Sequence, residues 1–204
     1  MPFQSHYFPN LGYLMDDVPE PLLEKLKKII YEKNLDNHNE NLAGNIKKEF
    51  KIPKAIGYFE QYIMSLCQEY DKEFNYISSI NVNQNRHPYC LDQMWVNFQK
   101  KYEFNPIHTH TGIFSFVIWL QIPYTKEQEK EASPGKFGNT DQAGCFQFHF
   151  NDILGGLETQ TIFADKTYEG KICVFPAKLR HSVSPFYSSD DYRISVSGNI
   201  MIGV

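Results

Sequence analysis

The chain has 204 residues, a net charge of −4 at pH 7, and 42% hydrophobic and 15% aromatic residues. These values exclude a largely disordered chain, because enough apolar surface is present to form a core. The negative charge offers no basic surface for general nucleic-acid binding, and no run of about 18 apolar residues is present to cross a membrane. We therefore expect a single domain over residues 1–204 that binds neither nucleic acid nor a membrane.

The cysteines indicate a reducing compartment. The chain has four cysteines, Cys67, Cys90, Cys145 and Cys173, which show no Cys-x-x-Cys spacing. Three of the four lie in segments expected to be buried helix or strand. This pattern is typical of reduced structural thiols rather than of disulfides or a zinc knuckle. Residues 1–10 also lack the charged start and apolar run of a signal peptide. The sequence therefore predicts a cytoplasmic protein.

The first 80 residues predict helices that support a sheet. Apolar residues recur at helical spacing in residues 22–30 and again in residues 55–74. Between them, residues 31–40 are polar and favour a loop, and residues 42–50 favour a short helix that Gly44 weakens. Each long helix has one apolar stripe, so we expect both to pack on the outside of a sheet.

From residue 91 onward the periodicity changes to two, which predicts strands. The expected strands cover residues 94–99, 114–122, 145–150, 160–164, 171–176 and 193–202. The segment 124–144 between them is charged and has no periodicity. A loop of this length in a compact domain is commonly functional, so we expect it to close over the mouth of a pocket.

The last expected strand indicates a polar interior. One face carries isoleucine and valine, and the other carries Arg193, Ser195, Ser197 and Asn199. The helices need an apolar sheet surface to cover, so the polar face should line the inside of a barrel or sandwich. The same alternation predicts that Asn97 and His149 point inward.

Three histidines predict a metal site. His108 and His110 stand two residues apart, so in an extended strand both imidazoles point from the same face. His181 is the third candidate, because it opens an extended segment after a turn marked by Pro176. Three ligands on one side of an ion leave open positions on the other side, as catalytic metal sites require.

Arg193 predicts a binding site for a carboxylate. It follows His181 by 12 residues and lies on the inward face with Ser195. A buried guanidinium without a protein carboxylate needs an anion, and its planar fork matches a carboxylate in a bidentate geometry. The arginine is therefore interpreted as half of a clamp for a dicarboxylate.

The pattern His108-Thr109-His110, then His181, then Arg193-Ile194-Ser195 resembles the Fe(II)/2-oxoglutarate-dependent oxygenases. The resemblance covers residues 94–202, is weak over the first 80 residues, and is closest to small members from phages and marine bacteria near the prolyl-hydroxylase branch. It implies a mainly β fold, a double-stranded β-helix (a jelly-roll, cupin-like barrel). Residues 90–204 would form this barrel, and two or three helices within residues 1–80 would brace it.

The resemblance also implies roles for particular residues. His108 and His181 would be catalytic metal ligands for Fe(II), and His110, at the position of the middle ligand, is the candidate for the third. Arg193 and Ser195 would hold the distal carboxylate of the co-substrate 2-oxoglutarate, and Asn97 could hydrogen-bond to it. The implied reaction is dioxygen-dependent hydroxylation of an unactivated C–H bond in a small molecule or a protein side chain, with release of succinate and CO2. A phage-encoded member would act in the host cytoplasm, and its oligomeric state is open.

The sequence departs from the family pattern at the middle ligand, where the family commonly has Asp or Glu and this chain has His110. Three alternatives follow. The site is a working three-histidine iron site, or a loop carboxylate such as Asp141 or Asp152 completes it, or it binds metal weakly without oxygenation. Two other functions also remain: a cupin-like three-histidine dioxygenase or isomerase that uses no keto acid, and a non-catalytic binding barrel of a phage.

Overall fold

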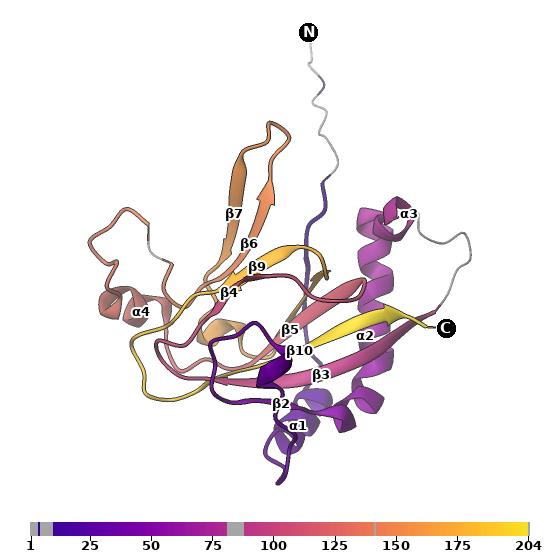
Figure 1. Cartoon of the computed structure of the whole chain (residues 1–204), viewed down its shortest axis with the longest axis horizontal. Coiled ribbons are helices and arrows are strands. Elements are labelled where there is room, and N and C mark those ends of the chain that lie inside the picture. Colours follow the sequence, from indigo (N-terminus) through magenta and orange to yellow (C-terminus); the bar gives the residue numbers. More distant parts are fainter. Residues whose placement is uncertain (1–3, 5–9, 81–87, 141, 204) are drawn as a thin grey trace.

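The structure is a computed structural model that describes residue 4 and residues 10–80, 88–140 and 142–203. Two antiparallel sheets form its centre (Figure 1). The larger sheet contains, in spatial order, β1 (Leu14–Asp17), β8 (Lys171–Pro176), β5 (Phe114–Gln121), β10 (Arg193–Ile202), β3 (Tyr89–Gln99) and β2 (Glu49–Lys51). The smaller sheet contains β4 (Asn105–His108), β9 (Arg180–Val183), β6 (Phe146–Asn151) and β7 (Leu157–Ile162).

Four helices and two short 3-10 turns complete the described chain. They are α1 (Glu20–Ile29), α2 (Pro53–Phe74), α3 (Tyr76–Ile80), α4 (Lys126–Ala132), η1 (Asn39–Asn41) and η2 (Lys166–Tyr168). The long helices α1 and α2 agree with the sequence prediction, and each has a proline in its first turn, where the missing N–H costs no hydrogen bond. No helix in the described part of the chain has the length and apolar character needed to span a membrane.

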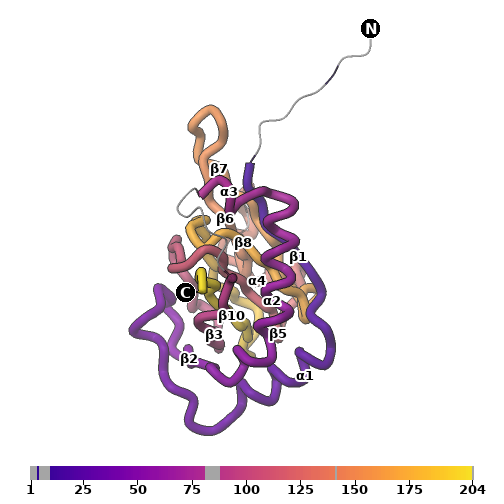
Figure 2. Tube along the Cα trace, turned by 90° about the vertical axis from the view of Figure 1, so that its right-hand side faces the viewer, coloured from indigo at the N-terminus to yellow at the C-terminus, as the bar shows by residue number. Residues whose placement is uncertain are grey.

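The helices α1 and α2 cover the outer face of the larger sheet, on the right-hand side of Figure 2. Their buried stripes include Leu26 and Phe59, which share one core cluster with Val96, Ile118 and Val196 of the central strands. The apolar face of β10 therefore lies under the helices, as the alternation predicts.

The space between the two sheets is partly aromatic and partly polar. A second core cluster there contains Trp119, Phe146, Phe148 and Phe175. Along β3 and β10 the inner face is polar, because Ser195 pairs with Asn97, Ser197 with Trp95 and Arg193 with Gln99. Polar side chains thus form a row along one wall of an interior that is otherwise apolar.

The prediction of a helix over residues 42–50 is wrong. The chain makes the 3-10 turn η1 and then the edge strand β2, in which Glu49 lies opposite Asn97 of β3. The strand β1 is a second edge strand in the segment expected to be helical, and it pairs with β8. Both strands depend on pairing with distant segments, which leaves no periodic signal in three or four residues.

The inward orientation predicted for His149 is also wrong. Phe148 lies opposite His181 on the inner face, so His149 is on the other face of β6. Its ring nitrogens contact the hydroxyls of Ser182 at 2.8 Å and Thr159 at 3.2 Å. The alternation of side chains along a strand defines two faces but does not show which of them points inward. On β6 the aromatic face points into the interior.

Candidate metal centre

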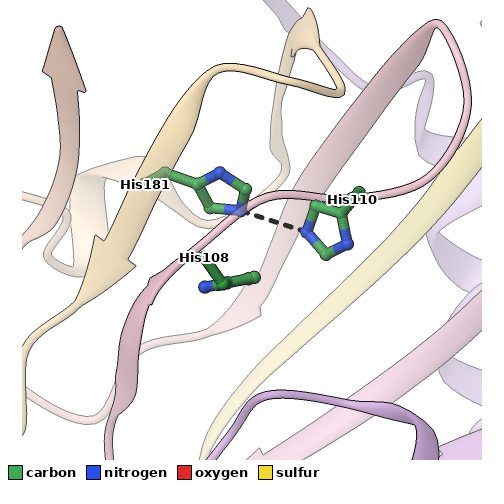
Figure 3. Close-up of side chains that lie close together, drawn as sticks. All are labelled: His108, His110 and His181. Atoms are coloured by element: carbon green, nitrogen blue, oxygen red, sulfur yellow. Dashed lines mark hydrogen bonds between the residues drawn. The ribbon is translucent and has the colours of Figure 1, made fainter.

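Three histidines converge at one end of the space between the sheets (Figure 3). His108 ends β4 and lies opposite His181 of β9, and His110 follows in the connection to β5. One nitrogen from each ring lies within 4.8 Å of the others, and this is the only such group of three metal-binding side chains in the described residues. The structure therefore brings together the three histidines that the sequence singles out.

Backbone carbonyl groups orient two of the rings. The Nδ1 atom of His108 lies 2.7 Å from the Pro106 oxygen, and that of His181 lies 2.9 Å from the Leu179 oxygen. A hydrogen on Nδ1 donates to each carbonyl, which leaves the Nε2 lone pair free to bind a metal. The backbone N–H of His110 donates to the Ala177 oxygen at 2.8 Å, which holds its loop beside β9.

The spacing of two nitrogens fits a shared ion. The Nε2 atoms of His110 and His181 are 3.0 Å apart (Figure 3). A metal ion binds an imidazole nitrogen at about 2.1 Å, so two such ligands at right angles are separated by about 3.0 Å. The pair therefore has the separation that two neighbouring ligands of one ion would have.

Burial keeps these imidazoles neutral. It lowers the pKa of His108, and it lowers the pKa of His110 to about 3, with a further contribution from the charge of His108. Burial likewise holds the pKa of His181 well below its usual range. Neutral imidazole is the form that binds a metal, so no proton must be removed at pH 7.

The ligand group contains no carboxylate. Among the described residues it consists of the three histidines alone. Asp152 caps the turn between β6 and β7, where its Oδ1 atom accepts the N–H groups of Leu154 at 2.9 Å and Gly156 at 2.7 Å. Asp141, the other carboxylate considered, lies outside the described residues.

A cavity of about 180 Å³ opens beside the histidines. Trp95 forms part of its wall and has its ring centroid 5.5 Å from that of His110. The other lining residues are Asn41, Leu42, Ala43, Gly44, Glu49, Asn97, Asn105, Thr109 and Ser197. Residues 41–44 thus border the cavity, and the segment 124–144, which we expected at its mouth, does not line it in the part that the structure describes.

Arg193 lies deeper in the fold, and its side chain is 4% exposed. Its Nη1 atom donates to the Tyr124 hydroxyl and to the Gly144 oxygen, both at 2.7 Å, and its Nη2 atom donates to Gln99 Oε1 at 2.6 Å. Its hydrogen-bond partners among the described residues are neutral groups. A buried positive charge balanced only by dipoles favours an anion nearby.

Ser195 and Asn97 lie between Arg193 and the cavity. Asn97 Nδ2 donates to Ser195 Oγ at 3.4 Å, and Asn97 also lines the cavity. Arg193 is four residues from the cavity residue Ser197, which corresponds to about 13 Å along a strand. The residues predicted to bind the co-substrate therefore form a row that leads inward from the histidines.

The facing sheets form a barrel of the double-stranded β-helix type, in which the clustered histidines are a candidate metal site, and the comparisons with known proteins agree. Residues 93–199 match the model of a family described as "Putative 2OG-Fe(II) oxygenase". This match spans more than half of the chain, so the chain belongs to that family and is an oxidoreductase. The family uses Fe(II) and 2-oxoglutarate, which confirms the predicted cofactors.

Solved structures confirm the fold. A prolyl-4-hydroxylase of Pseudomonas putida is similar with a TM-score of 0.57 and 12% identity, over 95% of this chain and 94% of that one. A prolyl hydroxylase from Trichoplax adhaerens, in complex with a peptide from hypoxia inducible factor, has a TM-score of 0.53 and 11% identity, over 94% and 83%.

A third solved structure is the non-heme alpha-ketoglutarate-dependent epimerase SnoN from nogalamycin biosynthesis, with a TM-score of 0.56 and 13% identity, over 94% and 76% of the two chains. No curated protein is similar enough in sequence to match. The structural similarity supports the double-stranded β-helix fold. Because the sequence identities are this low, it carries no information about the substrate.

Proposed function

We propose that the chain hydroxylates an unactivated C–H bond of a small molecule or a protein side chain, with dioxygen as oxidant and with conversion of 2-oxoglutarate to succinate and CO2. The observation that supports this most is the convergence of three neutral imidazoles on one point, two of them oriented by carbonyl groups. In this proposal His108, His110 and His181 hold Fe(II), which supplies the activation of dioxygen when bound.

The row along β3 and β10 is proposed to hold the co-substrate. Arg193 would give up a hydrogen bond to one of its neutral acceptors and bind the distal carboxylate of 2-oxoglutarate instead. Ser195 and Asn97 would add hydrogen bonds to the same co-substrate. The aromatic side chains between the sheets, among them Trp119 and Phe146, exclude water from this end of the site.

The whole chain is proposed to act as one domain. The edge strands β1 and β2 come from the first 51 residues, yet they belong to the same sheet as β3, β5, β8 and β10. Residues 41–44 also border the cavity of the histidines. The N-terminal segment would therefore contribute to the site as well as brace it.

One observation favours a second candidate function. Three histidines without a carboxylate are the donor set expected for a cupin-like dioxygenase or isomerase that uses no keto acid. Such an enzyme would have no use for Arg193, a buried cation that belongs to none of the ion pairs among the described residues. Succinate formation coupled to oxygen uptake supports the first function, and turnover of a substrate without 2-oxoglutarate supports the second.

The test of the co-substrate site is the variant Arg193→Lys, which keeps the positive charge and removes the planar fork. We expect 2-oxoglutarate binding to weaken by roughly tenfold or more, because a bidentate pair becomes a single contact. Binding would be measured anaerobically from the visible absorbance band that appears when 2-oxoglutarate joins the Fe(II) protein. Fe(II) affinity should stay within about twofold of the wild-type value, and equal loss of both ligands would assign Arg193 a purely structural role.

A further inference from the structure

The cavity beside the histidines contains a buried carboxyl group. Glu49 of β2 is 1% exposed and lies opposite Asn97 of β3. Glu49 lines the same cavity as His108, His110 and His181. The residue is therefore part of the wall that a ligand beside the histidines would meet.

Few contacts balance this carboxyl group. Asn39 Nδ2 donates to Glu49 Oε2 at 3.2 Å, and no described ion pair includes Glu49. Burial, together with the nearby charge of Glu103, raises the pKa of Glu49 to about 7. Burial makes the ionised form of this carboxyl group costly, and a positively charged ligand would stabilise that form.

Two further acceptors face the same cavity. The Oδ1 atoms of Asn97 and Asn105 are buried without a hydrogen-bond partner, and both residues line the cavity. Asn97 itself is 5% exposed, and its Nδ2 atom is directed to Ser195, so the free end of its amide is an acceptor. An unpaired buried acceptor destabilises the protein, and a donor from a ligand would remove that cost.

The loop 41–44 brings its backbone close to these acceptors. A Cβ atom on Gly44 would lie 2.3 Å from Asn105 Oδ1 and 2.9 Å from Glu49 Oε1. Only glycine allows the loop to approach this closely. Asn105 Oδ1 and Glu49 Oε1 therefore both lie beside Gly44, and all three residues line the cavity.

We propose that this cavity selects a prime substrate that carries a cationic nitrogen, an ammonium or guanidinium group, paired with Glu49 and hydrogen-bonded to the Oδ1 atoms of Asn97 and Asn105. The proposal rests on the proposed function, because the histidines of the metal site line the same cavity. A volume of about 180 Å³ suits one side chain or a small molecule. The bound cationic group lies beside the metal site. A C–H bond in the carbon chain that carries this group is thereby placed where it can be hydroxylated.

The test measures binding of defined probes to the metal-free protein by calorimetry. The cationic probes are arginine and lysine, each as the free amino acid and as the residue in a short capped peptide, and the neutral probes of similar shape are citrulline and norleucine. We expect a cationic probe to bind roughly tenfold or more tightly than its neutral counterpart, because hydrogen bonds to charged groups contribute about 1.5–3 kcal/mol. Free and capped probes distinguish a small-molecule substrate from a polypeptide.

Substitutions of Glu49 test whether this residue causes the preference for cationic probes. Glu49→Gln should remove the difference between arginine and citrulline, while Glu49→Asp, which keeps the charge, should retain it. Glu40→Gln is the matched control, because it removes one exposed negative charge next to the lining residue Asn41. This control should leave binding within about twofold of wild type, since exposed charges are screened.

Three results would overturn the proposal: equal binding of charged and neutral probes, undiminished preference in Glu49→Gln, or no binding of any probe. These results leave the proposed function standing if Fe(II) and 2-oxoglutarate still bind. Failure of the wild-type protein to bind Fe(II) or 2-oxoglutarate, with arginine binding intact, would instead reject the proposed function and keep the cation site.

Discussion

His110 is the residue at which this chain differs most from the expected ligand pattern. Three imidazoles leave Fe(II) with its full double charge, whereas a carboxylate in the middle position would remove one unit. The convergence of His110 with His108 and His181 is the observation that supports a direct ligand role for His110.

Substitution of His110 tests this role. His110→Ala should weaken Fe(II) binding by tenfold or more, whereas His110→Asp should retain it, because the carboxylate replaces the missing donor. Anaerobic equilibrium dialysis against Fe(II) measures both affinities. Wild-type affinity in His110→Ala would mean that a different group supplies the third ligand.

The raised pKa of Glu49 predicts that the free energy of unfolding depends on pH. Burial raises its pKa from 4.5 to about 7, so the folded state holds the proton more tightly than the unfolded state. The stability that this proton contributes is complete below pH 4.5 and is lost as the pH rises through about 7. The loss is at most about 3.5 kcal/mol, since one pKa unit corresponds to about 1.4 kcal/mol.

The measurement is urea unfolding of the wild type and Glu49→Gln at pH 5 and pH 8. Glu49→Gln should gain stability relative to the wild type at pH 8 and show little advantage at pH 5. The comparison removes contributions from other titrating groups, because they are common to both proteins. A difference between the two proteins that does not change with pH would contradict the prediction.

Sequence reasoning singled out the three histidines that cluster in the structure and missed Glu49 for a physical reason. His108 and His110 lie on one short stretch, and a turn marked by Pro176 precedes His181, so local patterns pointed to all three. Glu49 becomes buried only because β2 pairs with β3. A carboxyl group in a short polar segment carries no local signal for this contact.

At the scale of elements, α4 shows how a side chain fixes a surface segment. Glu129 is buried, and its carboxylate accepts hydrogen bonds from the backbone of Tyr187 at 2.5 Å and of Ser188 at 3.1 Å. The Ser188 hydroxyl donates to it as well, at 2.6 Å. The helix is thereby attached to the connection between β9 and β10.

Glu129→Ala should destabilise the protein by about 1.5–3 kcal/mol, because the hydrogen bonds that its carboxylate accepts from Tyr187 and Ser188 are lost. Urea unfolding measures the change. Glu127→Ala is the matched control on the same helix, since Glu127 is exposed, and it should change stability by less than about 0.5 kcal/mol. Equal effects of the two substitutions would show that Glu129 does not anchor the helix.

Some helices and strands could be predicted from the sequence, and others could not. The bounds of β10 agree with the prediction, because its strict alternation runs through ten residues. The helix α4 was missed within a segment interpreted as a loop, although Thr125 and Gln128 form a capping box whose pattern is visible in the sequence. The edge strands β1 and β2 left no comparable signal, because their partners lie far away along the chain.

At the scale of the whole molecule, ligand binding should raise the free energy of unfolding. A ligand that binds only the folded state stabilises it by about 2.7 kcal/mol at a concentration a hundredfold above its Kd. For a chain of this size that free energy raises Tm by roughly 5–10 °C. Fe(II) and 2-oxoglutarate should therefore each increase Tm under anaerobic conditions, and the increase from 2-oxoglutarate should depend on Fe(II).

The most direct measurement is the amount of Fe(II) bound at equilibrium under anaerobic conditions, for the wild type and for His181→Ala. The wild type should bind about one ion per chain, and more tightly when 2-oxoglutarate is present, because the keto acid adds ligands to the same ion. His181→Ala should lose this binding while remaining folded by circular dichroism. Binding of Fe(II) that is equally strong in His181→Ala, or absent from the wild type, would contradict the assignment of His108, His110 and His181 as the metal centre.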